Sequence, residues 1–449
     1  MKKMKNNLPE NVLYIMKRLS QNGYESFVVG GSLRNLLLGE EPKDFDMTTN
    51  ATPEEILRIF ADCKTFDNGL KHGTVSIVFD GEVYEVTTYR IDGEYLDNRH
   101  PKEVRFTDNI KEDLSRRDFT VNAIAYNPKI GIVDYFNGEE DIKCRCIRCV
   151  GNADERMKED ALRVLRALRF ASVYNFTIEP QTEQAIFNNM SLLKNISYER
   201  ISTELKGILI GQNVGYVLKK FCDVFAVFIP ELKPMFGFNQ NNPHHDKNLW
   251  EHTVCAVQNV ENKPLLRTVM LFHDICKPQA QTIDKNGVSH FHNHDKMGSE
   301  TVKMILKRLK FSKKFTETAS MLIYYHDTRI SADKPSVKKL LNILNEENFR
   351  LLMKIQYADI MAQSQYKRTQ KITVHSKVNS LFEEIIRNNE CYTLKQLAVN
   401  GRDLFTIGIQ KGDIIGKILN ELLELVINGK LKNEKKELLA YIKKQAVSE

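Results

Sequence analysis

The sequence predicts an α+β protein in which a mixed N-terminal part is followed by helical domains. Strand-like runs of β-branched residues occur before about residue 150 and fade after it, where apolar residues recur at helical spacing. The chain has 449 residues. That length exceeds one ordinary hydrophobic core, so we expect two to four domains.

The expected N-terminal elements follow one another closely. A strand in "ESFVVGG" (25–31) enters a turn, and the short helix "SLRNLLLG" (32–39) ends at Gly39. A hairpin is predicted from "GTVSIVF" (73–79) and "EVYEVTTYR" (82–90), because the turn dipeptide "DG" lies between them. The polar stretch 92–104 has no clear period, so we expect a mobile loop there.

Helices dominate the expected structure after residue 150. The segments "EDALRVLRALRFASVY" (159–174) and "ERISTELKGIL" (199–209) have helical spacing. From about residue 245 the chain is helix-rich and holds most of its histidines. We interpret the polar stretch 366–376 as a linker, and the tail 377–449 as helical apart from "AVNGRDLFTIGIQKGD".

Composition predicts a globular, cytoplasmic protein. Apolar residues make up 42% of the chain, and runs such as "VFAVFIP" (224–230) are too short to span a bilayer. No apolar segment follows the basic start "MKKMKNN", which argues against a secretory signal. The formal net charge of +7 permits an anionic partner such as RNA but does not require one.

Three of the eight cysteines, Cys144, Cys146 and Cys149, cluster in "KCRCIRCV". A metal knuckle would need a second ligand pair at a suitable spacing, and none is evident. We therefore expect a short strand that carries reduced thiols.

Asp44 and Asp46 form the most informative pair in the chain. On a strand, residues i and i+2 point to the same face, so both carboxylates would point out together while Phe45 points into the core. Two carboxylates on one face suit a hard divalent cation, above all Mg²⁺. The alternative is a capped turn with two surface acids.

Phosphate-binding features precede this pair. Gly30 and Gly31 let a backbone approach a phosphate closely, and the start of the following helix favours an anion. Arg34 is one turn into that helix and could reach the same phosphate. Together with the aspartates, these features predict nucleotidyl transfer, in which metal ions polarise a triphosphate and activate an attacking hydroxyl.

These motifs identify a family. The segment "GGSLRNLLLGEEPKDFDMTT" (30–49) resembles the first motif of bacterial-type tRNA nucleotidyltransferases and poly(A) polymerases, which are similar to the DNA polymerase β superfamily at the transfer site. "RRDFTVNAIAY" (116–126) resembles their second motif and "EDALRVLRALRF" (159–170) their base-selecting motif. "GLKHGTVSIV" and "VYEVTTYR" fit as well. The resemblance implies that Asp44 and Asp46 hold the catalytic metals in a polymerase β-like head with a mixed sheet, which all-α domains follow.

Two positions in the expected head, Asn35 and Glu85, bear on how the catalytic metals are held. The family usually has Val-Arg-Asp where this chain has Leu33-Arg34-Asn35, which could alter metal or loop support. A third acid often completes such sites, and Glu85 on a neighbouring strand is our candidate. Its alternative is an exposed strand glutamate.

Glu159, Asp160 and Arg163 are expected on one helical face, since they are three and four residues apart. Cytosine and adenine each present an amino donor beside a ring-nitrogen acceptor, which a carboxylate and an arginine can read. Uracil and guanine present the reverse pattern, and each buried mismatch costs on the order of 1–3 kcal/mol. Asp160 and Arg163 could thus select CTP and ATP. The alternative is a solvated ion-pair stripe.

The resemblance assigns further roles near the nucleotide. It implies that Glu159 orients Arg163, and that Arg117, Asp118 and Asn122 hold the sugar and triphosphate. Arg166 and Arg169 could support the template or meet phosphate. The stretch 92–104 matches the flexible element that relatives use in switching from C to A addition.

The histidine-rich half resembles the HD phosphohydrolase superfamily. "LFHDICKP" has the adjacent His-Asp pair, with a histidine before it and an aspartate after it. Imidazole and carboxylate ligands suit a divalent transition metal or Mg²⁺. The resemblance implies one metal on His252, His273, Asp274 and Asp359, and His294 and His326 could hold a second metal or grip a phosphate. Hydrolysis by this site is left open, and His244 and His245 are assigned no role.

The expected domains are a catalytic head (1–148), a neck for base selection and RNA binding (149–243), an HD domain (244–370) and a tRNA-contacting tail (371–449). In the tail, Arg402 and Lys411 could assist RNA binding beside a helix start, although a plain helical hairpin explains the same pattern.

The sequence thus predicts an enzyme that adds C, C and A to the tRNA 3′ end from CTP and ATP without a nucleic-acid template. Mg²⁺ is the expected cofactor, and neither a membrane nor an obligate protein partner is implied. The alternatives are a poly(A) polymerase or partial adder of the same family, and an HD phosphohydrolase with an RNA-binding N-terminal half.

Overall fold

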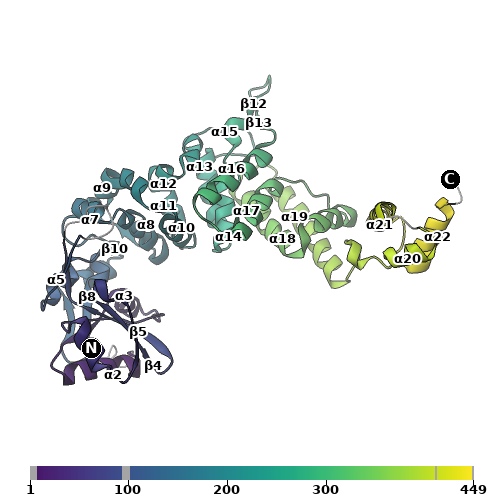
Figure 1. Cartoon of the computed structure of the whole chain (residues 1–449). Coiled ribbons are helices and arrows are strands. Elements are labelled where there is room, and N and C mark those ends of the chain that lie inside the picture. Colours follow the sequence, from purple (N-terminus) through teal and green to yellow (C-terminus); the bar gives the residue numbers. More distant parts are fainter. Residues whose placement is uncertain (1–7, 94–101, 410–411, 447–449) are drawn as a thin grey trace. The chain divides into compact units, whose positions relative to one another are not determined.

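The computed structural model describes residues 8–93, 102–409 and 412–446 (Figure 1). The chain divides into two compact units, residues 1–230 and 231–449. The first unit contains a mixed sheet and the second is mostly helical, which confirms the predicted fold class (Figure 1). Among the described residues, no helix is both long enough and apolar enough to cross a membrane.

A seven-stranded sheet forms the centre of the head. Its strands, in sheet order, are β3 (Lys64–Gly69), β4 (Thr74–Phe79), β5 (Glu82–Thr88), β2 (Asp46–Thr49), β1 (Ser26–Val29), β8 (Ile124–Asn127) and β9 (Gly131–Asp134). β2 and β5 run parallel and the other neighbours run antiparallel. The β4–β5 hairpin confirms the turn predicted at "DG".

Helices and a short ribbon accompany this sheet: α2 (Glu10–Gln21), α3 (Gly30–Leu38), α4 (Pro53–Ile59), α5 (Ile110–Ser115), α6 (Gly138–Lys143), and β6 (Arg90–Asp92) paired with β7 (Val104–Phe106). α3 ends as predicted, because Gly39 adopts the left-handed backbone that closes a helix. Phe27 and Val29 of β1 and Tyr89, which lies between β5 and β6, pack with Ile110 and Leu114 of α5, so α5 has a fixed place against the sheet.

The rest of the first unit is helical, with α7 (Ala153–Glu159), α8 (Leu162–Tyr174), α9 (Pro180–Asn189), α10 (Tyr198–Leu209), α11 (Val214–Lys220) and α12 (Cys222–Phe228). Cys146 lies in the short strand β10 (Cys146–Ile147), which pairs with β11 (Thr177–Ile178). Cys144 and Cys149 flank that strand, and all three thiols are free, as predicted.

The second unit contains α13 (Leu249–Asn259), α14 (Pro264–Phe272), α15 (Lys277–Ala280), α16 (His294–Arg308), α17 (Lys313–Tyr325), α18 (Lys334–Ala362), α19 (Arg368–Arg387), α20 (Gly401–Thr406), α21 (Gly412–Ile427) and α22 (Lys435–Ala446). A small hairpin of β12 (Gln281–Ile283) and β13 (Ser289–Phe291) interrupts the helices, which the sequence reading missed.

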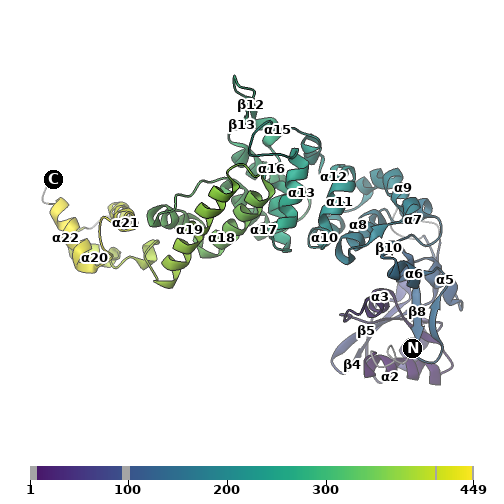
Figure 2. The same cartoon turned by 180° about the vertical axis from the view of Figure 1, so that it is seen from behind.

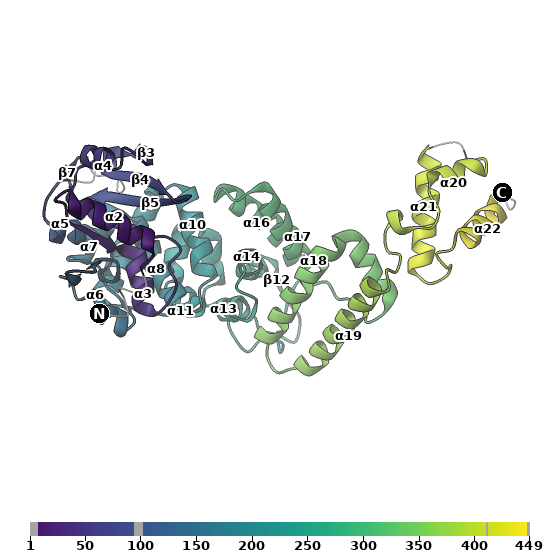
Figure 3. The ribbon, with the colours of Figure 1, turned by 90° about the horizontal axis from the view of Figure 1, so that it is seen from below.

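The linker expected at 366–376 is wrong, because most of this stretch forms the first half of α19. α19 lies beside α18 (Figures 2 and 3). The apolar residues that hold it, Val378, Phe382 and Ile385, come in its second half and are buried. The polar first half therefore carries no apolar period by which sequence reasoning could recognise a helix.

Candidate functional site

Asp46 opens strand β2 in the middle of the sheet. It pairs in register with Glu85 of β5 and Val29 of β1. Asp44 lies two residues before the strand begins, and Phe45 is only half-buried. The expectation that both aspartates lie on one strand with Phe45 in the core is therefore wrong, because the chain becomes extended only at Asp46.

The three predicted acids still interact electrostatically. Burial and the negative charges of Asp44 and Glu85 raise the pKa of Asp46, and the nearby Arg117 opposes that rise. Carboxylates that raise one another's pKa are crowded, and a divalent cation would relieve the repulsion. The acids present therefore fit a Mg²⁺ site.

The glycine turn lies directly against these groups. Gly30 has a left-handed backbone, and a Cβ there would lie 3.2 Å from Arg117 Nη1 and 3.7 Å from Asp46 Oδ2. At Gly31 a Cβ would lie 3.5 Å from Arg34 Nη2. At Gly30, therefore, glycine is the residue that adopts this backbone without strain beside the arginine and the carboxylate.

A cleft of about 820 Å³ gathers most of the predicted nucleotide-binding residues. Its predicted members are Gly30, Gly31, Arg34, Asp44, Asp46, Arg117, Asp118, Asn122, Asp160, Arg163, Arg166 and Arg169. The sequence reading missed His72, Arg90, Asp92, Arg116, Phe170 and Tyr174. Glu85 and Glu159 are not among the lining residues. Since arginines outnumber aspartates in the lining, the cleft suits a polyanionic ligand.

Arg34 is buried and forms part of the wall of this cleft. Its guanidinium donates to Asn122 Oδ1 at 2.6 Å, to Tyr174 Oη at 2.6 Å and to Asn35 Oδ1 at 2.9 Å. It also lies 4.4 Å from the centroid of the Tyr174 ring, and burial lowers its pKa. Asn35, where the family resemblance led us to expect aspartate, therefore still supplies Arg34 with an acceptor oxygen.

Asp118 links the head to helix α8. It accepts hydrogen bonds from Asn122 Nδ2 at 3.0 Å and Arg166 Nε at 2.8 Å. Burial alone would raise the pKa of Asp118, but the Arg166 charge and the Asn122 bond outweigh it and lower the pKa to about 2. Asp118 is therefore an anion that is already paired, and it positions Arg166 and Asn122.

The residues predicted to select the base are arranged differently from the prediction. α7 ends at Glu159 and α8 begins at Leu162, with Asp160 extended between them, so the single helical face is wrong. Glu159 does hold Arg163, with Oε2 2.5 Å from Nη1. Asp160 instead pairs with Arg200 of α10 at 2.9 Å.

Two backbone carbonyls also accept hydrogen bonds from Arg163. Its Nη1 donates to the Arg156 carbonyl at 2.9 Å and its Nη2 to the Arg116 carbonyl at 3.2 Å. Arg169, the last arginine of this helix, pairs with Glu204 at 2.8 Å. Asp160 and Arg163 nevertheless both line the cleft.

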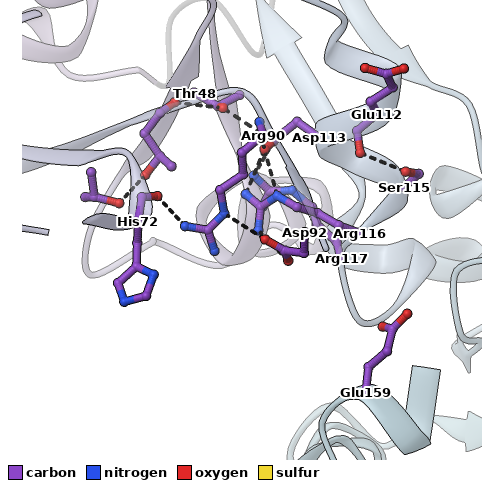
Figure 4. Close-up of polar contacts among 12 residues, drawn as sticks. Thr48, His72, Arg90, Asp92, Glu112, Asp113, Ser115, Arg116, Arg117 and Glu159 are labelled. Carbon is purple, nitrogen blue, oxygen red and sulfur yellow. Dashed lines mark hydrogen bonds and ion pairs between the residues drawn. The ribbon is translucent and has the colours of Figure 1, made fainter. Parts of the chain in front are cut away.

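Arg116 and Arg117 both bond to the buried carboxylate of Asp113 (Figure 4). Arg90 donates to the carbonyl of His72 and forms an ion pair with Asp92 at 3.3 Å (Figure 4). Most of the 92–104 stretch (94–101) lies outside the described residues, as does Lys411. Arg402 lies in the first turn of α20.

A second cluster lies within the second unit. His252 Nε2 is 3.0 Å from Asp359 Oδ1, and His273 Nε2 is 3.1 Å from Asp274 Oδ2. The ligand atoms of His252, His273 and Asp274 lie within 4.8 Å of one another, and so do those of Asp274, His294 and His326. All six predicted residues therefore meet, and Asp274 belongs to both groups.

The histidine rings have a fixed orientation. In three of them Nδ1 donates to a backbone carbonyl, which turns Nε2 toward the cluster. The pairs are His273 with Met270 at 2.7 Å, His294 with Phe291 at 2.7 Å and His326 with Ile323 at 2.6 Å. Imidazole nitrogens and carboxylate oxygens that lie within 4.8 Å of one another fit a divalent metal ion, which neutral imidazoles would bind through Nε2.

Residues that the sequence reading missed surround this cluster. Gln363 donates to Asp359 Oδ2 at 2.7 Å, and Lys371 donates to the amide oxygen of Gln363. Lys277 Nζ is 2.7 Å from Asp274 Oδ2. His245, which had no assigned role, packs its ring against His252 at 4.9 Å, and burial lowers its pKa to about 2.

Comparisons with known proteins define the class first. Residues 26–148 match the family model described as "Poly A polymerase head domain", so the cleft belongs to a nucleotidyltransferase. Residues 175–236 match "Probable RNA and SrmB- binding site of polymerase A", and residues 289–442 match "tRNA nucleotidyltransferase domain 2 putative".

Full-length relatives then define the family. The chain is 32% identical over 435 residues to the CCA-adding enzyme of Lactobacillus helveticus, covering 95% of each chain, and 32% identical over 432 residues to that of Staphylococcus haemolyticus, covering 96% of each. A crystal structure of the Bacillus stearothermophilus CCA-adding enzyme in complex with CTP matches with a TM-score of 0.66 and 30% identity over 98% of each chain. The protein belongs to the family of bacterial-type CCA-adding enzymes.

Proposed function

We propose that this protein adds C, C and A to the 3′ end of tRNA, using CTP and ATP and no nucleic-acid template. The observation that carries the proposal is the cleft, which brings an acidic group, a glycine turn and a set of arginines together with Asp160 and Arg163. The family membership supports it, since relatives along nearly the whole chain are CCA-adding enzymes.

In this proposal Asp44 and Asp46 hold Mg²⁺, and Glu85 contributes to their electrostatic environment. The bound metal would polarise the triphosphate and lower the pKa of the attacking hydroxyl. The tRNA 3′ oxygen then bonds to the α-phosphorus, the bond to the β-phosphate oxygen breaks, and pyrophosphate leaves. Arg117 beside the glycine turn would neutralise phosphate charge.

In this proposal Arg163 reads the base, and its side chain is held in one orientation before the nucleotide binds. Glu159 and two backbone carbonyls occupy Arg163 and fix its guanidinium plane. Asp160, held by Arg200, offers acceptor oxygens in the same cleft. Arginine donors and carboxylate acceptors match cytosine and adenine and oppose uracil and guanine.

A stepwise assay tests this function. We expect purified protein to extend a tRNA lacking CCA with CTP alone by two residues, and to extend a tRNA ending in CC with ATP alone by one residue. UTP and GTP should give no product, because each faces mismatched donors and acceptors. Long adenosine tracts would instead identify a poly(A) polymerase, and products that stop short would identify a partial adder.

We further propose the division into head (1–148), neck (149–243), HD domain (244–370) and tail (371–449), with tRNA contacts in the neck and tail. In the HD domain, His252, His273, Asp274 and Asp359 would hold one divalent metal. His294 and His326 would hold a second metal with Asp274, or grip a phosphate. Metal-bound water there would support hydrolysis of phosphate esters.

Removing one ligand tests the HD site. We expect His273→Ala to lower bound Mn²⁺ or Ni²⁺ by at least tenfold after gel filtration, measured by elemental analysis. His290→Ala, which changes a half-buried histidine of β13 outside the cluster, should leave the metal content unchanged. Incorporation of CTP and ATP should persist in both variants. Unchanged metal content in His273→Ala would contradict the site.

A further inference from the structure

We infer that Asp113 is a positioning residue that holds Arg117 and Arg116 in place for the β- and γ-phosphates of the incoming nucleotide. The inference deepens the proposed function and rests on it, because it concerns the same cleft. Asp113 does not line the cleft, so it acts through the two arginines, which do.

Asp113 is fully buried, with 0% of its surface exposed. Its Oδ1 accepts from Arg116 at 2.7 Å and 3.0 Å, and its Oδ2 accepts from Arg117 Nη2 at 3.2 Å (Figure 4). A buried carboxylate that is paired with two guanidinium groups stays ionised and fixes the planes of both.

The same carboxylate connects the arginines to the strand of the acidic group. Thr48, two residues after Asp46 on β2, lies with Oγ1 3.4 Å from Asp113 Oδ2 (Figure 4). The backbone N–H of Arg90 donates to Oδ1 at 3.4 Å. Asp113, in α5, therefore ties the two arginines that directly follow this helix to the strand that carries Asp46.

Arg117 spans from this anchor to the glycine turn. Nη2 bonds to Asp113, while Nη1 is the atom 3.2 Å from the Cβ position of Gly30. One edge of the guanidinium is thus occupied by Asp113, and the other faces the turn and Asp46. That edge lies where a triphosphate would meet both the backbone and the metal-binding acids.

Nucleotide binding distinguishes positioning from a general structural role. We expect Asp113→Asn to raise the Kd of CTP about tenfold, because an unfixed arginine loses charge-assisted bonds to phosphate, while the Kd of CMP changes by less than about twofold. Both values are measured by calorimetry on the full chain. The matched control is Asp141→Asn, since Asp141 is a buried carboxylate that pairs with Arg148 and does not line the cleft.

A double-variant cycle supplies the second readout. Arg117→Met should reproduce most of the CTP loss, and Asp113→Asn in that background should add little, because Asp113 acts through Arg117. The inference is overturned if CTP and CMP weaken equally, if the two losses add, if CTP binding is unchanged, or if Asp113→Asn unfolds while Asp141→Asn stays folded. Wild-type protein that binds no CTP would refute the proposed function itself.

Discussion

Asp46→Asn is expected to lower nucleotide incorporation by about 10³-fold or more while tRNA binding persists. Metal-assisted stabilisation of the transition state supplies several kcal/mol, and each 1.4 kcal/mol is a tenfold change in rate. Asparagine keeps the shape of the side chain but removes its charge. Single-turnover incorporation of CTP and gel-shift measurement of tRNA binding check this result.

The same substitution should slightly raise the melting temperature of the metal-free protein. The pKa of Asp46 is raised in the folded chain, so above the ordinary carboxyl pKa its ionised form destabilises the fold, and that cost disappears when the charge is removed. Asp62→Asn, an exposed acid paired with Arg18, is the control for incorporation. Unchanged turnover in Asp46→Asn would refute the metal role and favour an HD phosphohydrolase with an RNA-binding N-terminal half.

Arg163→Ala is expected to reduce discrimination between CTP and UTP by about tenfold to a hundredfold. The lost donors contribute roughly 1–3 kcal/mol to rejecting the wrong base. Loss of the guanidinium also leaves Glu159 without one of its two arginine partners, so we expect a modest fall in melting temperature. The ratio of kcat/KM values for the two nucleotides on tRNA lacking CCA measures the effect.

Arg148→Ala is the matched control for selection, because Arg148 pairs with Asp141 and Glu179 and does not line the cleft. It should leave the CTP to UTP ratio unchanged. Equal discrimination before and after Arg163→Ala would remove the role of Arg163 in reading the base. A loss confined to KM for every nucleotide would assign Arg163 to general binding.

Local sequence patterns predicted the features that depend on neighbouring residues. The hairpin at "DG" and the end of α3 at Gly39 were correct, since a turn dipeptide and a left-handed glycine are set by local backbone preferences. The segregation of strands before about residue 150 from helices after it was visible in the apolar spacing. The resemblance to a known family predicted which residues gather in the cleft and in the histidine cluster.

Packing between segments distant in the sequence determines the side-chain partners that the sequence patterns did not predict. The partner of Asp160 is Arg200, forty residues away on another helix, and the break between α7 and α8 separates Asp160 from the face of Arg163. Arg34 lines the cleft as expected of a phosphate-binding candidate, but its hydrogen bonds to Asn122 and Tyr174 were not foreseen. Neither outcome follows from spacing, because each depends on where distant segments meet.

The geometry around Gly30 also constrains how this chain can vary over generations. A methyl group at that position would require the Arg117 guanidinium to shift slightly, and the residue would have to adopt a left-handed backbone that side-chain-bearing residues rarely adopt. A substitution at Gly30 therefore carries a backbone cost and also displaces Arg117 beside Asp46.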